Sequence, residues 1–228
     1  MKIVVVLLTL LCVIPVLAQK KPKPTCNATR VGNCPKEGCG GDPEMNKRKN
    51  VTTRPSSGHV QVYKRADFTS LTFPATWKRG TPRGKLKEWG EGTAVEYEAF
   101  LVDAKNYSSG AEATNCNLKG DSNNDWHLVL QTRQTITDEY KSITAEATPR
   151  IRPNGWTWKK ILKLRREKAY VKLVGYLFYD SEHVNESKPA RVTHWEIHPV
   201  TSFKVCIGSI ASCKAGDNWQ DLSNFPEP

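Results

Sequence analysis

The sequence predicts a mainly β fold, and two features of the chain lead to this prediction. Five stretches alternate apolar and polar residues as strands do, and turn-forming residues separate them. One stretch with helical spacing of its apolar residues lies between the third and fourth of these strands. Three strands, a helix and two strands is the element order of the OB-fold, a five-stranded barrel. The predicted architecture is an OB-like barrel after an irregular, disulfide-tied N-terminal arm, although alternation alone also permits a β-sandwich.

The first predicted strand covers residues 93–101, where Val95, Tyr97 and Ala99 alternate with more polar neighbours. Because successive side chains point to opposite faces of a strand, this spacing buries one face. Gly175 interrupts the fourth strand and indicates a bulge or tight bend, which a closing barrel requires. The other predicted strands cover residues 125–131, 142–148, 170–179 and 193–205.

The single predicted helix covers residues 157–168, with Thr157 as its N-cap. Trp158, Ile161 and Leu162 fall at helical spacing and form the expected buried face. The side chains expected to face solvent are Lys159, Lys160, Lys163 and Arg166. The helix is therefore expected to be amphipathic, with a basic outer face.

Residues 1–18 have the features of a secretory signal peptide. Lys2 precedes an apolar run from Ile3 to Leu17, and Val16 and Ala18 supply small residues before the expected cleavage point. The run is shorter than the roughly 20 residues of a membrane-spanning helix. We therefore expect a secreted protein, extracellular or periplasmic, with no transmembrane segment in the mature chain.

Composition divides the rest of the chain into four segments. Residues 19–60 are rich in Lys, Pro, Gly and Asn, and are expected to form an irregular, cysteine-containing basic arm. Residues 61–90 lead into the barrel, and a short strand is expected near residues 60–63. The barrel domain is expected at residues 91–206, and a C-terminal tail at residues 207–228.

Six cysteines follow the signal peptide, and an even number in an exported chain predicts three disulfides. Their pairing stays open, although Cys206 and Cys213 are spaced to close a short loop. A zinc site that includes Cys34 and Cys39 is the competing interpretation, but no second close pair with histidine follows. The six are Cys26, Cys34, Cys39, Cys116, Cys206 and Cys213.

Four Asn-x-Ser/Thr triplets are candidate N-glycosylation sites if the chain is made by a eukaryote. They begin at Asn27, Asn50, Asn106 and Asn185. Because a glycan is bulky and hydrated, each site that is used must lie on the surface.

The chain of 228 residues is basic, with 34 Lys and Arg against 23 Asp and Glu, a formal net charge of +11. Such a surface favours polyanions: nucleic acid, anionic glycans or acidic membrane surfaces. Solubility is the alternative explanation, because the basic residues are widely spread. Basic clusters at residues 20–23 and 47–49 fit solvated loops or polyanion contacts. The hydrophobic content of 38% excludes disorder of the whole chain.

Two predicted strands each carry a carboxylate and an imidazole two residues apart: Asp125 with His127, and Glu196 with His198. Side chains at this spacing leave the same face of a strand. Carboxylate and imidazole together suit a divalent metal such as Zn or Mn, and also suit a general base. If the four form one catalytic site, their functional atoms should converge within about 3–5 Å and be open to solvent.

A structural polar network is the alternative interpretation of these residues. The histidines would then donate to Asp125, to Glu196 or to backbone at a seam of the barrel. Arg150 also has two interpretations, a bidentate phosphate ligand or an ion-pair partner of Glu146.

The motifs Asn124-Asp-Trp-His-Leu128 and Trp195-Glu-Ile-His-Pro199, with Asp180 and His183 between them, resemble a largely uncharacterised, mostly bacterial family of OB-like proteins. The resemblance covers about residues 88–206. It implies the barrel and the pairing of the two motifs in space. It implies no established activity, and the arm and the tail depart from the family's pattern.

The sequence predicts a secreted OB-like protein that binds a polyanion, above all a nucleic acid. OB barrels bind single strands by stacking bases on aromatic rings beside a basic groove. The predicted binding residues are Arg150, Trp126, Trp195, Asp180 and His183, and further candidate rings are Tyr97, Tyr176 and Phe178.

Two alternative functions remain open. A metal-assisted phosphodiesterase or nuclease would use Asp125, His127, Glu196 and His198 with a divalent metal as cofactor. An adaptor or inhibitor would bind a protein or a glycan through the wide loops at residues 106–124 and 180–192.

Overall fold

The computed structural model describes residues 26–71, 83–182 and 191–228. The predicted signal peptide and the basic cluster at residues 20–23 lie outside these ranges. The helices are α1 (Pro43–Lys49), α2 (Arg65–Ser70), α3 (Arg83–Glu88), α4 (Trp158–Glu167) and α5 (Ile210–Lys214). The strands are β1 (Gln61–Tyr63), β2 (Ala94–Asn106), β3 (Trp126–Gln131), β4 (Ile143–Ala147), β5 (Tyr170–Tyr179), β6 (Trp195–Cys206) and β7 (Trp219–Asp221).

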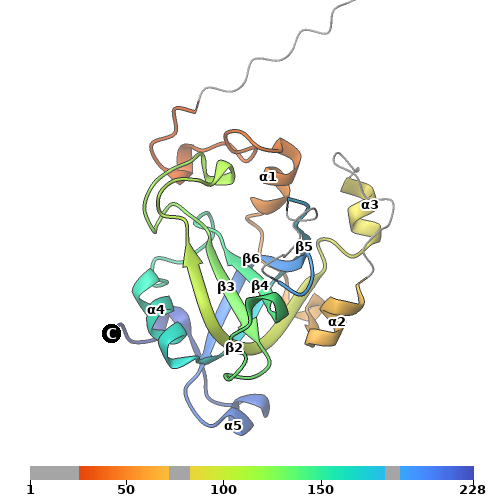
Figure 1. Ribbon diagram of the computed structural model, residues 1–228, viewed down its shortest axis with the longest axis vertical. Helices are drawn as coiled ribbons and strands as arrows, with labels where there is room; N and C mark the ends of the chain where they lie inside the picture. Colours follow the sequence, from red (N-terminus) through yellow and green to blue (C-terminus); the bar gives the residue numbers. More distant parts are fainter. Residues whose placement is uncertain (1–25, 72–82, 183–190) are drawn as a thin grey trace, which may run out of the picture.

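Five strands close into a barrel in the order β2-β3-β4-β6-β5, and β5 pairs with β2 to complete it (Figure 1). Within these five strands, neighbours are antiparallel except β4 and β6, which pair in parallel through Ala145 and Ile197. Helix α4 connects β4 to β5. These features confirm the predicted OB-like barrel, including the position of its helix.

The alternation in the sequence decides which side chains fill the barrel. Val95, Tyr97 and Ala99 of β2 point into the core, as do Leu128 and Leu130 of β3. Helix α4 adds apolar residues from outside the strands. The core residues that it contributes are Ile161 and Leu164. One continuous apolar cluster results, and the side chains that alternate with these residues along a strand point to the opposite face.

Strand β5 bends at Gly175, where its register against β6 shifts on both sides of the glycine. A Cβ atom there would lie 2.4 Å from the carbonyl oxygen of Pro199 and 2.5 Å from Ile197 Cγ2. Only glycine permits so close an approach of the two strands. The bend predicted from the sequence is therefore confirmed.

Helix α4 begins as predicted, because Thr157 Oγ1 accepts a hydrogen bond from the Lys160 backbone amide at 3.4 Å. The prediction that the Lys160 side chain faces solvent is wrong, since the residue is only 5% exposed. Its ammonium donates to the carbonyl oxygens of Gly155, Leu222 and Ser223 at 2.8–3.1 Å. These three acceptors satisfy the buried charge and fasten the C-terminal tail to the helix.

The arm is not irregular throughout. Asp42 accepts hydrogen bonds from the amides of Glu44 and Met45, and Pro43 occupies the first helical position, so this sequence starts helix α1. The short strand expected near residues 60–63 is confirmed as β1, which pairs in parallel with β2.

Three disulfides tie the fold together: Cys26–Cys39, Cys34–Cys116 and Cys206–Cys213. The first closes a loop within the arm, the second joins the arm to the loop after β2, and the third closes the short loop after β6. The competing zinc interpretation is wrong for Cys34 and Cys39, because their sulfurs are used in two different disulfides.

The candidate glycosylation sites differ in exposure. Asn27 is exposed, and Asn106 is half-buried with its amide donating to Asp121 Oδ1 at 3.0 Å. Asn50 is fully buried and donates to the carbonyl oxygens of Lys36 and Thr114, so it cannot carry a glycan in the folded protein. The Asn185 triplet lies outside the described residues.

None of the helices in the described parts of the chain combines the length and the apolar character that crossing a bilayer requires.

Candidate functional site: a polar cluster under the arm

The predicted site residues lie together on the outer wall of the barrel. Trp126 and Leu128 of β3 point into the core, so Asp125 and His127 lie on the opposite face. On β6, Ile197 points inward, and therefore Glu196 and His198 point outward with the same alternation. Glu146 of β4 pairs across from His127. The parallel pairing of β4 with β6 then brings the two motifs side by side.

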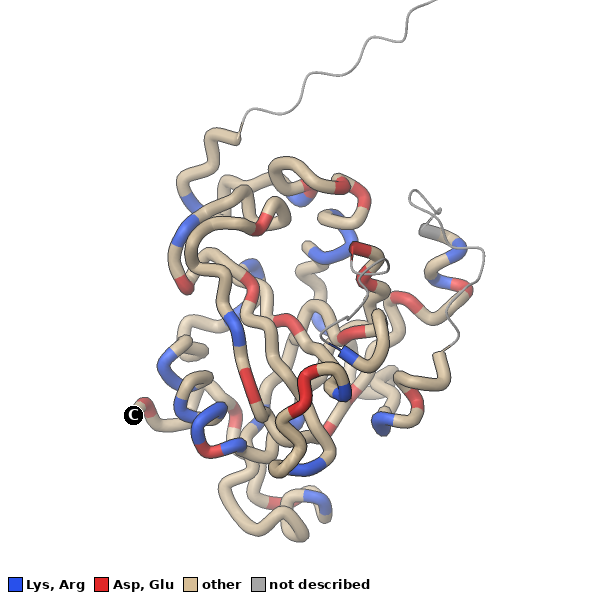
Figure 2. Tube along the Cα trace, in the orientation of Figure 1, with Lys and Arg blue, Asp and Glu red and all other residues tan. Residues whose placement is uncertain are grey.

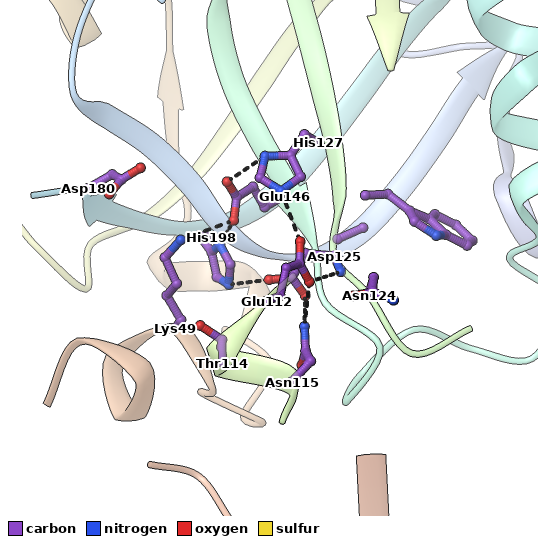
Figure 3. A network of polar contacts seen from close by, with 12 residues as sticks. Lys49, Glu112, Thr114, Asn115, Asn124, Asp125, His127, Glu146, Asp180 and His198 are labelled. Atoms are coloured by element: carbon purple, nitrogen blue, oxygen red, sulfur yellow. Dashed lines mark hydrogen bonds and ion pairs between the residues drawn. The ribbon is translucent and has the colours of Figure 1, made fainter. Parts of the chain in front are cut away.

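Glu146 links the two histidines. Its Oε1 lies 3.0 Å from His127 Nδ1, and its Oε2 lies 2.6 Å from His198 Nδ1. The other ring nitrogen of His198 is 3.8 Å from Asp125 Oδ2 (Figure 3). Glu196 Oε1 is 3.5 Å from His198 Nδ1. The expected convergence is confirmed for Asp125, Glu196 and His198, whereas His127 joins them through Glu146, which lies at the centre of the cluster.

The remaining oxygens of these carboxylates are held by other side chains. Asp125 Oδ1 accepts a hydrogen bond from Asn115 at 3.0 Å, and Glu196 Oε2 lies 2.5 Å from the guanidinium of Arg191. Glu112 Oε1 lies 3.2 Å from His127 Nε2. Each carboxylate is therefore fixed in orientation, which leaves one oxygen of Asp125, Glu146 and Glu196 directed at His198.

Sequence reasoning missed Glu112, Arg191 and Lys49. Glu112 lies in the loop between β2 and β3, and Lys49 ends the short helix α1, which the sequence did not predict, so no pattern marked the direction of either side chain. Arg191 stands only five residues before Glu196, and its proximity to that carboxylate was the one signal available.

The N-terminal arm covers this wall. Lys49, the last residue of α1, reaches to 3.5 Å between its Nζ and Glu146 Oε2. Arg150 donates to the carbonyl oxygens of Cys34 and Pro35 at 3.0 and 2.9 Å. The predicted roles of Arg150 as a phosphate ligand or as the partner of Glu146 are not what the structure shows, because its donors hold the arm against the barrel.

The cluster is closed to solvent. Asp125, Glu146, Glu196 and His198 are at most 2% exposed. The side chain of His127 is the most accessible of the set at 19%. The expectation of an open catalytic site is therefore wrong for this conformation, because the arm fills the space that a substrate would need.

One small cavity of about 220 Å³ reaches the edge of the cluster at His198. It lies between the arm, α3 and β5, and its lining includes Arg48, Lys87, Tyr176 and Phe178. Arg48 is paired with Glu91, and its guanidinium lies 4.9 Å above the Phe178 ring. The Phe178 ring lies 5.5 Å from the His198 ring.

The electrostatics favour charged imidazoles. Burial alone lowers the pKa of an imidazole, but the carboxylates around His198, Glu146 foremost, outweigh it and raise this pKa to about 9. Glu146 likewise raises the pKa of His127 well above its usual value, again against the effect of burial. Burial raises the pKa of a carboxyl, but the two imidazoles and Lys49 hold that of Glu146 well below its usual value.

The other predicted binding residues lie at the edge of the cluster or in the core. Asp180 is buried and lies 3.1 Å from Arg191, while His183 is outside the described residues.

Trp195 is 1% exposed and packs inside the barrel, so it cannot stack on a base. The same holds for Tyr97, and Phe178 is buried under the arm. Tyr176 is half-buried.

A second hollow, of about 540 Å³, lies away from the cluster at the start of α4. Trp126, Trp156 and Trp158 contribute to its lining, together with Lys159 and Glu227. Trp158 is half-buried, so part of its ring faces the hollow. Trp126 is thus placed at a surface depression as well as in the core, and is the one predicted aromatic ligand that lines this depression.

Comparisons of the chain with protein-family models, with curated proteins and with solved structures find no match.

Proposed function

We propose that this protein binds a single-stranded nucleic acid through the tryptophan hollow and the adjoining outer face of α4. The observation that carries the proposal is the convergence of three tryptophans beside the first turn of a basic helix. Proteins that bind single strands combine aromatic stacking platforms with a positively charged track for the phosphates.

The hollow supplies the stacking element. The ring of Trp158 lies 5.6 Å from that of Trp126, and the guanidinium of Arg152 lies 3.8 Å from the Trp126 ring centroid on a stacked approach. Arg152 donates to carbonyl oxygens of the loop before β3 and to that of Ala147 in β4, and these hydrogen bonds hold the guanidinium in place over the Trp126 ring. Trp126 is 2% exposed, so a base that enters the hollow would stack on the half-buried ring of Trp158, which Trp126 supports from below.

The start of α4 supplies the anion-binding element. Glu227 of the C-terminal tail accepts a hydrogen bond from Thr157 Oγ1 at 2.7 Å, which places a carboxylate at the N-terminus of this helix. The partial positive charge of a helix N-terminus attracts phosphate as well as carboxylate. Because Glu227 is exposed, a phosphate can displace it.

The outer face of α4 extends the site. Lys159, Arg165 and Arg166 are exposed along this helix, and Figure 2 shows the resulting run of basic residues beside the C-terminus. A strand whose base occupies the hollow could pass its next phosphates along this face. The barrel wall that OB-folds commonly use for ligands is covered here by the arm, so we place the nucleic acid elsewhere.

A metal-assisted phosphodiesterase is the second candidate, favoured by the convergence of Asp125, Glu146 and His198. Its residues are buried, so hydrolysis would require the arm to leave the wall. We therefore prefer binding as the function, and expect no cleavage of an oligonucleotide incubated with the protein.

The test is fluorescence anisotropy with labelled single-stranded oligonucleotides at several salt concentrations. Affinity should fall steeply with salt, since phosphate neutralisation releases counterions. Trp158→Ala should weaken binding about tenfold through lost stacking. Lys159→Ser with Arg166→Ser should reduce the salt slope by about two.

The matched control removes two positive charges from α3, by Lys85→Ser with Lys87→Ser, and should leave the affinity nearly unchanged. Salt-independent binding, or an equal loss in the control, would contradict the proposal. Tighter binding of heparin oligosaccharides than of oligonucleotides would replace nucleic acid with an anionic glycan.

A further inference from the structure

We infer that Asp125, Glu146 and His198 form a binding site for one divalent cation of the Mn²⁺ or Zn²⁺ class. Each of the three places one ligand atom within 4.8 Å of the ligand atoms of the other two. Carboxylate oxygens with an imidazole nitrogen are the ligands that these ions take in proteins. Metal–ligand distances of about 2.0–2.2 Å place the ligand atoms of a tetrahedral site roughly 3.3–3.6 Å apart, so the widest pair has to close by up to about 1.5 Å when the ion binds.

The surroundings hold two of the ligands in the manner of a metal site. Asn115 donates to one oxygen of Asp125 at 3.0 Å, and His127 Nδ1 lies 3.0 Å from one oxygen of Glu146. The second oxygen of each carboxylate faces His198: Glu146 Oε2, which Lys49 also contacts, lies 2.6 Å from Nδ1, and Asp125 Oδ2 lies 3.8 Å from Nε2 (Figure 3). Partners of this kind, which fix the orientation of a ligand, are a regular part of metal sites.

His198 provides an independent observation. Its side chain is 1% exposed, and neither ring nitrogen makes a hydrogen bond with any of the described residues. Asp125 Oδ2 is 3.8 Å from Nε2, too far for a hydrogen bond, and Glu146 Oε2 is 2.6 Å from Nδ1 but without the direction that a hydrogen bond requires. A buried imidazole in this position calls for an additional partner, and a cation shared with the two carboxylates supplies one.

Lys49 is expected to compete with the cation. Its ammonium lies 3.5 Å from Glu146 Oε2, on one of the proposed ligands. A metal ion and this ammonium repel each other at such a distance. Replacing Lys49 with an uncharged residue of similar shape should therefore strengthen metal binding, an outcome that a purely structural ion network does not predict.

The experiment uses the untagged mature protein after treatment with EDTA. Calorimetric titration with ZnCl₂ and MnCl₂ should show one site per chain, and pulsed EPR of the Mn²⁺ form should show coupling to an imidazole nitrogen. Asp125→Asn should weaken binding at least tenfold. Lys49→Met should strengthen it several-fold, and the control Glu98→Gln, on the outside of β2, should change neither.

Three results would overturn the inference: no bound ion in both the wild-type protein and Lys49→Met, affinity unaffected by Asp125→Asn, or Mn²⁺ without nitrogen coupling. If Asp125→Asn does not fold, as judged by tryptophan fluorescence, the EPR measurement on the wild-type protein decides. None of these readouts depends on nucleic-acid binding, so the two proposals can fail separately.

Discussion

Glu146 and His198 lie side by side on the parallel pair of strands β4 and β6, with Glu146 Oε2 2.6 Å from His198 Nδ1. The two residues are 52 positions apart in the chain and meet only when the barrel closes. Because both are at most 1% exposed, neither can recover solvation by itself if the other is removed.

We therefore expect His198→Ala to destabilise the metal-free protein by about 3 kcal/mol or more, because three carboxylates lose their shared partner. For a protein of this size the loss corresponds to a Tm lower by roughly 6–12 °C. Thermal unfolding in EDTA measures it. His59→Ala in the exposed part of the arm is the control, and an unchanged Tm for His198→Ala would show that the cluster is not structural.

The disulfides should contribute unequally to stability. Cys34–Cys116 spans 82 residues and Cys206–Cys213 spans 7. Chain entropy predicts losses of about 4 and about 2 kcal/mol when each pair is replaced by serine. Urea unfolding of the two serine variants tests this order of stability losses.

A thiol titration of the denatured, non-reduced mature protein should find no free thiol. Two or more reactive thiols would contradict the pairing of the six cysteines.

Lys160→Met should loosen the C-terminal tail. The substitution keeps most of the side-chain volume but leaves three carbonyl oxygens without their donor, a loss of about 1–3 kcal/mol. Hydrogen exchange should then increase around Leu222 and Ser223. The neighbouring exposed lysine supplies the control, and Lys159→Met should leave exchange and stability as they are.

Gly175→Ala should strain the barrel, because the new Cβ meets the Pro199 carbonyl oxygen, a backbone atom that cannot move aside. We expect a loss of about 1–3 kcal/mol in the free energy of unfolding. Gly58→Ala is the matched control, since a Cβ there meets nothing within 4 Å. Equal stability of the two variants would contradict the close approach of β5 and β6.

Glu227→Gln should strengthen binding of a single-stranded oligonucleotide about two- to fivefold, because a carboxylate no longer competes for the N-terminus of α4. Glu44→Gln removes the same charge from an exposed position on α1, and so controls for the change in net charge. If both variants gain equally, the effect belongs to the overall charge rather than to the hollow.

The barrel could be predicted from the sequence because its determinants are local. Alternation marks each strand, Gly175 marks the bend, and Thr157 marks the start of the helix. The i and i+2 spacing also placed Asp125 with His127, and Glu196 with His198, on common faces. These inferences depend only on the geometry of one strand or one helix, which neighbouring residues specify.

Only the tertiary structure showed that the polar cluster is closed to solvent. Whether it opens to solvent depends on the arm, whose Lys49 and disulfide partner Cys34 are distant in the chain from the strands they cover. Lys160 and Trp195 are likewise buried, although the sequence around each of them is compatible with an exposed side chain. Exposure is set by whichever segment packs on top, and the sequence of a strand does not contain that information.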